Sequence, residues 1–170
     1  MLSKQPGSSA PPSIPEPVAA SLLRLPLYPL RLAPARLLGA VMERLLAVTL
    51  AQHERDGELD FLEGRKLQIR VEDVGLEWII TRAGGRWRVL DGRREADAVI
   101  RGQVREFVLL ASRREDPDTL FFQRRLVIEG DVEFGLQAKN LLDSLEWEAL
   151  PTPLRWLLAN AGSLAVQVGG

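Results

Sequence analysis

The side chains that most often carry out catalysis are scarce in this chain. It has no cysteine and a single histidine, His53, which excludes thiol catalysis, thiolate metal sites and multi-histidine metal clusters. Its position among charged residues near an expected helix end is typical of a solvated surface histidine. Three serines, Ser112, Ser144 and Ser163, lack the flanking glycines of a nucleophile elbow. We therefore expect no enzyme activity and no catalytic residue.

Motifs for metals and cofactors are equally weak. Acids alternate with other residues over 56–63, as in a calcium loop, but Phe61 stands where that loop needs glycine. Gly84 and Gly85 belong to a hairpin turn rather than to a phosphate-binding loop. The sequence thus predicts a solvated acidic loop at 56–63, no metal and no cofactor.

The charge and the length of the chain limit its possible function and its number of domains. The chain has 170 residues, and 22 basic residues against 23 acidic ones leave a net charge of -1, which argues against a general nucleic-acid binder. Its length suits one domain with an appended arm. Paired arginines could bind phosphate, or could simply lie on a solvated face; they are at 93–94, 113–114 and 124–125.

The N-terminal region divides into two parts. Residues 1–17 are rich in proline and are expected to form a disordered arm. Residues 18–55 combine an apolar, basic segment with a helix from about 34 to 54, and prolines and arginines exclude a transmembrane span. The segment could contact an anionic membrane or pack on the protein's own domain. The predicted membrane-contact residues are Leu22, Leu23, Arg24, Leu27, Tyr28 and Arg31.

The start of the chain lacks the features of a secretory signal. We therefore expect a cytoplasmic protein, with peripheral contact at the inner face of the membrane if the basic segment binds lipid.

Periodicity then predicts an α+β domain over 56–150, followed by an apolar segment over 151–170. Alternating apolar residues indicate five strands in a mainly antiparallel sheet with meander connections. Helical spacing indicates helices after 103, at 118–123 and after Asp131, a suitable N-cap. The predicted strands are 67–72, 76–81, 87–89, 96–101 and 125–129.

The predicted helices carry more apolar residues than are needed to bury one face of each helix. The helix after 103 carries Val104, Phe107 and Val108, and two adjacent rings follow at 121–122. Gly135, inside a predicted helix, suggests the close approach of a neighbour or of an elongated ligand. The apolar residues form either an ordinary core or a tunnel between sheet and helices.

Residues 118–131 carry a family likeness. Their sequence, Asp-Thr-Leu-Phe-Phe-Gln-Arg-Arg-Leu-Val-Ile-Glu-Gly-Asp, followed by Gly135-Leu136 and Lys139-Asn140-Leu141, resembles the signature of the sterol carrier protein 2 domain. The resemblance, over about 60–147, implies a five-stranded sheet covered by helices around a hydrophobic lipid tunnel, without catalysis. The pattern and the resemblance together give the lipid-binding candidates Val104, Phe107, Val108, Phe121, Phe122, Phe134, Leu141 and Leu142.

The arm, the preceding helix and residues 140–143 resemble the branch of this family that supports bacterial ubiquinone synthesis. That branch implies a non-catalytic accessory factor in oxygen-independent ubiquinone biosynthesis. It would bind isoprenoid quinone precursors or phospholipid and present them to hydroxylase partners among the biosynthetic enzymes. The alternative from the residues alone is a structural adaptor whose apolar groove binds a helix of a partner protein.

Overall fold

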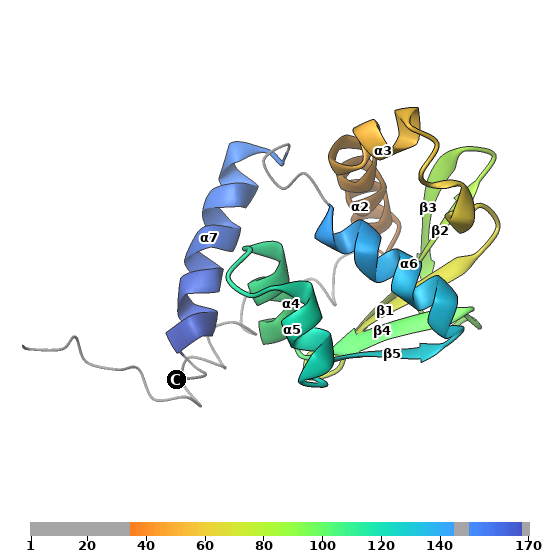
Figure 1. The fold of residues 1–170 in the computed structure, drawn as a ribbon. Coiled ribbons are helices and arrows are strands. Elements are labelled where there is room, and N and C mark those ends of the chain that lie inside the picture. Colours follow the sequence, from red (N-terminus) through yellow and green to blue (C-terminus); the bar gives the residue numbers. More distant parts are fainter. Residues whose placement is uncertain (1–34, 145–149, 168–170) are drawn as a thin grey trace, which may run out of the picture.

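Five strands form one sheet, and the helices lie on one of its faces (Figure 1). The structure is a computed structural model that describes residues 35–144 and 150–167. The predicted disordered arm at 1–17 and the predicted membrane-contact residues at 22–31 lie outside the described residues. The strands are β1 (Lys66–Val71), β2 (Leu76–Ala83), β3 (Arg86–Asp91), β4 (Ala98–Gly102) and β5 (Leu126–Gly130).

The sheet has the order β3-β2-β1-β4-β5, which confirms a mainly antiparallel sheet and the meander from β1 to β3; the predicted meander connection from β3 to β4 is wrong. β1 pairs antiparallel with β2, β2 with β3, and β4 with β5, whereas β1 and β4 are parallel. Ile69 on β1 lies opposite Trp78 on one side and Ile100 on the other. The chain therefore leaves β3 and crosses to the far side of β1.

Two long-range contacts explain this crossing. The outer edge of β3 is occupied by helix α2 (Ala35–Thr49), where Glu43 Oε1 accepts a hydrogen bond from the Val89 N–H at 2.9 Å. The connection after β3 folds back over β1 and β2, and Gln68 Nε2 donates to the Gly92 carbonyl oxygen at 2.7 Å. The outer edge of β3 is thus covered by α2, and β4 pairs with the free edge of β1.

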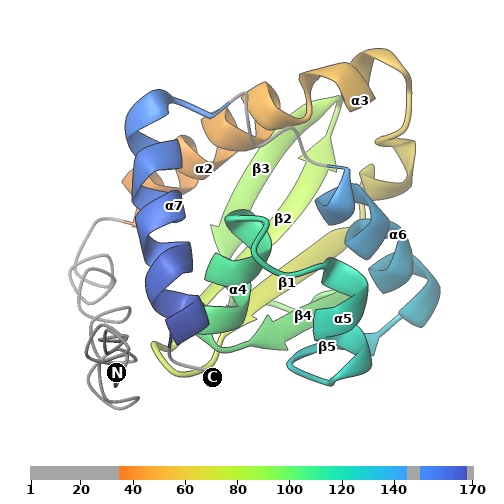
Figure 2. The ribbon, with the colours of Figure 1, turned by 60° about the vertical axis from the view of Figure 1, so that its left-hand side comes forward.

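The helices lie on one side of the sheet (Figure 2). The helix predicted over 34–54 is interrupted at Leu50, which is buried. The predicted acidic loop is only partly right, because Leu59 and Leu62 within it are 1% exposed and belong to the core, while its acids stay exposed. The remaining elements are α3 (Ala51–Arg55), the 3-10 turn η3 (Asp60–Leu62), α4 (Val104–Ala111), α5 (Pro117–Phe122), α6 (Val132–Asp143) and α7 (Thr152–Gln167).

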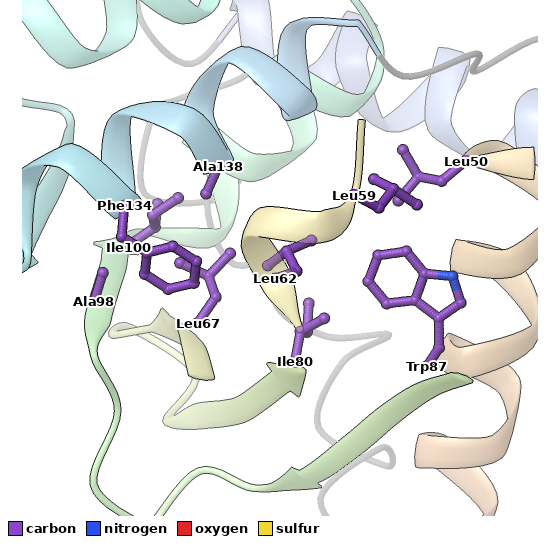
Figure 3. Packing of buried hydrophobic residues seen from close by; sticks show 10 residues of the cluster. All are labelled: Leu50, Leu59, Leu62, Leu67, Ile80, Trp87, Ala98, Ile100, Phe134 and Ala138. Carbon is purple, nitrogen blue, oxygen red and sulfur yellow. The ribbon is translucent and has the colours of Figure 1, made fainter. Parts of the chain in front are cut away.

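The largest hydrophobic cluster fills the space between β1–β4, α6 and the α2–η3 region (Figure 3). Phe134 on α6 points toward Leu67 and Ile100 of the sheet, and Trp87 on β3 faces Leu50 from the other side. Each side chain of this cluster is at most 9% exposed. The cluster consists of Leu50, Leu59, Leu62, Leu67, Ile80, Trp87, Ala98, Ile100, Phe134 and Ala138.

Asp131 caps α6, as predicted from the sequence. Its Oδ1 accepts from the Phe134 N–H at 3.0 Å, and its Oδ2 lies 2.5 Å from Arg65 Nη2. The backbone hydrogen bond from Phe134, followed by the one from Arg65, holds the pKa of the Asp131 carboxyl below its usual value. The ionised carboxylate therefore stabilises the fold.

Replacing Asp131 with asparagine gives the first prediction, a stability difference that depends on pH. A folded-state pKa that is lowered contributes stability above the unfolded value, about pH 3.9, and this contribution is lost as the pH falls through the folded value. Urea unfolding across the pH range should show wild-type protein more stable than Asp131→Asn at neutral pH. The difference should shrink below about pH 4. A difference that stays constant in acid would contradict this role for the carboxylate.

Candidate functional site

Phe107 on α4 lies where three hydrophobic clusters of the described residues meet. It packs against the large cluster under α6, a second cluster between β1–β2, α4 and α7, and a third formed by Leu110, Leu120 and Leu126. Phe121 and Leu142 join the first and third clusters. Phe107, Phe121, Leu141 and Leu142 are nevertheless only half-buried.

The sheet contributes two more half-buried residues. Ile69 and Trp78 are register partners near the centre of the sheet, on the face that the helices cover. Both side chains pack against the hydrophobic clusters, yet the helices cover them only in part. We call Ile69, Trp78, Phe107, Phe121, Leu141 and Leu142 the apolar wall. Space next to such side chains holds water poorly and is favourable for a hydrocarbon.

Four of the eight predicted lipid-binding residues lie in the apolar wall, and the other four lie elsewhere. Val104 and Val108 pack in the second cluster, next to α7. Phe134 is 0% exposed and stacks edge-on against Phe61 with ring centroids 5.9 Å apart, so it fills the core and leaves no surface for a ligand. Phe122 is 91% exposed and does not join the wall. Successive helical residues point about 100° apart, so only Phe121 of this pair can face the sheet.

A groove of about 520 Å³ runs beside the edge strand β5. It is lined by Phe121, Leu126, Val127 and Ile128, together with Arg101 and Arg124. Apart from Phe121, and from Arg124 as a member of an arginine pair, these residues were not predicted as site residues from the sequence, and neither were Ile69 and Trp78. The alternation in the predicted strands was the signal that could have placed Ile69, Trp78 and Ile128 on the helix-covered face.

Gly135 lets α6 approach β5 at this groove. A Cβ atom at Gly135 would overlap Cγ2 of Ile128. Of the two interpretations of this glycine, the close approach of a neighbour is therefore confirmed.

A buried ion network fixes the helix that carries Phe107. Glu106 is 6% exposed, and its Oε1 accepts from Arg105 Nη1 at 3.2 Å and from Arg125 Nε and Nη2 at 3.3 Å. Arg125 also pairs with Glu115 at 2.7 Å. These bonds tie α4 to the start of β5 and thereby position Phe107. A structural role accounts for this charge cluster.

A second cavity, of about 350 Å³, has a different character. Apart from Leu110, Pro117 and Leu142, its lining is charged: Arg113, Arg114, Glu115, Asp116 and Asp143.

Within residues 35–144 and 150–167, no cluster of acids and histidine has the arrangement of a metal site. None of the helices described there is long and apolar enough to cross a membrane.

The sheet and the apolar wall lie in a part of the chain that matches a known protein family. The model of the SCP-2 sterol transfer family matches residues 42–143. The chain belongs to this family. The matched range includes all five strands and every residue of the apolar wall. The SCP-2 match thus confirms the resemblance seen in residues 118–131.

One relative refines the placement within the SCP-2 family, and one solved structure shares the fold. The chain is 45% identical over 130 residues to the ubiquinone biosynthesis accessory factor UbiT of Escherichia coli (strain K12), covering 76% of this chain and 74% of that protein. A solved structure described as a UbiJ-SCP2 ubiquinone synthesis protein shares the fold, with a TM-score of 0.52 and 21% identity. That similarity covers 64% of this chain and 95% of the solved one.

Proposed function

We propose that this protein is a non-catalytic, lipid-binding accessory factor in oxygen-independent ubiquinone biosynthesis. It binds isoprenoid quinone intermediates or phospholipid and presents them to hydroxylase partners. The 45% identity to UbiT supports the pathway. The observation that carries lipid binding is the apolar wall, whose Ile69 and Trp78 stay half-buried beneath the helices.

The physical basis of binding is the removal of a hydrocarbon tail from water. Each Å² of apolar surface that is buried contributes about 25 cal/mol, so an isoprenoid tail needs no polar anchor to bind an apolar wall. Phe107 and Phe121 offer aromatic surface to the tail. A tail held in this way leaves its quinone ring available to a modifying enzyme.

Fluorescence titration tests this function. A long-tailed quinone should quench Trp78, which belongs to the wall, in a saturable way, whereas the same quinone ring without its tail should not. The chain has four tryptophans, so Trp78→Phe should remove the quenching. The matched control is Trp156→Phe, because Trp156 is exposed on α7 and its loss should leave the quenching intact. Equal binding of the tailless ring, or no saturable binding, would refute the proposal.

The membrane-contact segment at residues 22–31 is a second part of the proposal and gives another prediction. Removing residues 1–33 leaves α2 intact, since that helix begins at Ala35. The truncated protein should sediment less with anionic vesicles than the full chain. The difference should be larger at low salt, because charge attraction between arginines and lipid is screened by ions. Vesicles of neutral lipid are the control, and equal sedimentation of both proteins with anionic vesicles would contradict the prediction. In this proposal the protein works in the cytoplasm, at the inner face of the membrane.

A further inference from the structure

The two edges of the sheet differ in how the rest of the chain protects them. Helix α2 lies along the outer edge of β3, where Glu43 Oε1 accepts a hydrogen bond from the Val89 N–H at 2.9 Å. β5 is the outermost strand on the other side (Figure 1), and no strand of the described residues pairs with its outer edge. Its sequence, Leu-Val-Ile-Glu-Gly, has none of the lysines and prolines that often protect an edge strand. In the described part of the chain, β5 is therefore open to pairing with a further strand.

The hydrogen bonds around β4 show which residues of β5 face outward. Residues of an antiparallel pair alternate between bonded and non-bonded partners. The Asp131 N–H donates to the Asp97 carbonyl oxygen at 2.8 Å, so Asp131 and every second residue before it along β5 bond toward β4. In agreement, the Gly102 carbonyl oxygen of β4 accepts from the Glu72 N–H on the opposite side at 2.9 Å. The residues of β5 whose backbone groups point away from β4 are Leu126, Ile128 and Gly130.

The two ends of β5 carry opposite charges. Arg124 precedes the strand, is exposed, and lines the groove of about 520 Å³ beside it. Glu133 follows the strand, in the first turn of α6, and is also exposed. Among residues 35–144 and 150–167, neither side chain has an ion-pair or hydrogen-bond partner. By contrast, the neighbouring Arg125 is bound by Glu106 and Glu115.

We propose that a second copy of the chain pairs with this edge, so that the two β5 strands run antiparallel about a twofold axis at Ile128. Ile128 then exchanges hydrogen bonds with Ile128 of the second copy. In this register Arg124 lies opposite Val132 of the second copy and beside its Glu133, and the axis repeats the contact. A twofold interface requires a patch that complements itself, and the opposite charges at the two ends of β5 meet this requirement. Val132, which is 65% exposed in one copy, is covered by the stem of Arg124.

The pairing also completes the groove beside β5. One copy contributes Phe121, Leu126 and Ile128 to its apolar lining. Side chains that face each other across antiparallel strands lie on the same face of the sheet, so the two Ile128 side chains stand next to each other. The dimer thereby covers apolar surface at the edge that a single copy leaves in water. The second copy thus adds a residue to the groove, although the pairing itself needs no lipid.

Charge reversal tests this dimer. The molecular mass of the purified full chain is measured by sedimentation equilibrium over a range of concentrations, without added lipid, and wild-type protein should form a dimer. Arg124→Glu and Glu133→Arg should each raise the Kd of the dimer at least about tenfold, because each variant brings like charges together twice. The double variant Arg124→Glu/Glu133→Arg restores opposite charges and should return the Kd to within about threefold of wild type. The matched control is Arg88→Glu, which makes the same charge change at an exposed position on β3 and should leave the Kd unchanged.

Amide hydrogen exchange locates the interface. Within the described residues of one copy the Ile128 N–H has no hydrogen-bond partner, so it should exchange slowly in the wild-type dimer and fast in Arg124→Glu. A dimer in which the Ile128 N–H exchanges fast would overturn the inference, as would equal effects of the reversals at Arg124 and Arg88. Wild-type protein that stays monomeric would also overturn it and leave the edge to a strand of another protein. Because no lipid is added, each of these failures is distinct from a failure of quinone binding.

Discussion

Replacing Phe121 with aspartate should lower the affinity for long-tailed quinones by at least about tenfold, because a carboxylate would have to be desolvated against hydrocarbon. Phe121 packs against two hydrophobic clusters and lines the groove beside β5. A charge at this position disrupts both the wall and the groove. Quinone titration of the purified variant measures the effect.

The adjacent ring provides the matched control. Phe122 ends the same helix but is 91% exposed, so Phe122→Asp should keep quinone affinity within about twofold and leave the melting temperature unchanged. Phe121→Leu, which keeps an apolar side chain, should retain most of the quinone affinity of the wild-type protein. This comparison removes the general effect of adding a negative charge to α5.

The same pair of variants distinguishes lipid binding from the adaptor alternative. An adaptor whose groove accepts a partner's helix predicts that Phe121→Asp reduces capture of a biosynthetic partner while quinone affinity is unchanged or absent throughout. A loss of quinone affinity confined to Phe121→Asp supports the lipid-binding proposal. Equal effects of Phe121→Asp and Phe122→Asp would contradict the placement of the wall.

Replacing Phe134 with alanine should have the largest effect on stability, lowering the free energy of unfolding by about 3–5 kcal/mol. The ring is fully buried, meets Phe61 edge-on, and lies under the Arg65 guanidinium, whose carbon is 4.1 Å from the ring centroid. Removing it leaves a cavity between α6 and the sheet. Urea unfolding at neutral pH measures the loss.

Phe134→Leu separates packing from ligand binding. Because leucine fills most of the space, this variant should lose less than about 2 kcal/mol and keep its quinone affinity. A small loss of stability accompanied by a large loss of quinone affinity would contradict the assignment of Phe134 to the hydrophobic core. The ring would then belong to the wall.

The strands could be predicted because their apolar residues alternate, as in Leu67, Ile69 and Val71. The order of β1, β2 and β3 followed from the hairpin turns between them, but the place of β4 beside β1 could not be predicted. In the structure α2 covers the outer edge of β3, with Glu43 bonded to Val89, a contact between residues far apart in the sequence. A local pattern contains no information about which edge of a strand a helix will occupy.

Likewise, only some residues of the candidate site could be predicted from the sequence. Helical spacing and the family resemblance brought out Phe107, Leu141 and Leu142, which all pack against the largest hydrophobic cluster. Neither signal could decide which of two adjacent rings faces the sheet, because that depends on how α5 docks. The arginine pairs were visible in the sequence, but only the fold separates Arg113, which bonds to α6, from Arg124, which lines the groove.

The most direct test of lipid binding is mass spectrometry of the organic-soluble molecules that co-purify with the full chain. Wild-type protein isolated from bacteria should carry an isoprenoid quinone intermediate or a phospholipid in near-stoichiometric amount, and Phe121→Asp should carry much less. Wild-type protein that yields no lipid, and that binds neither quinone nor phospholipid when these are added back, would contradict the claim that the apolar wall holds a hydrocarbon chain.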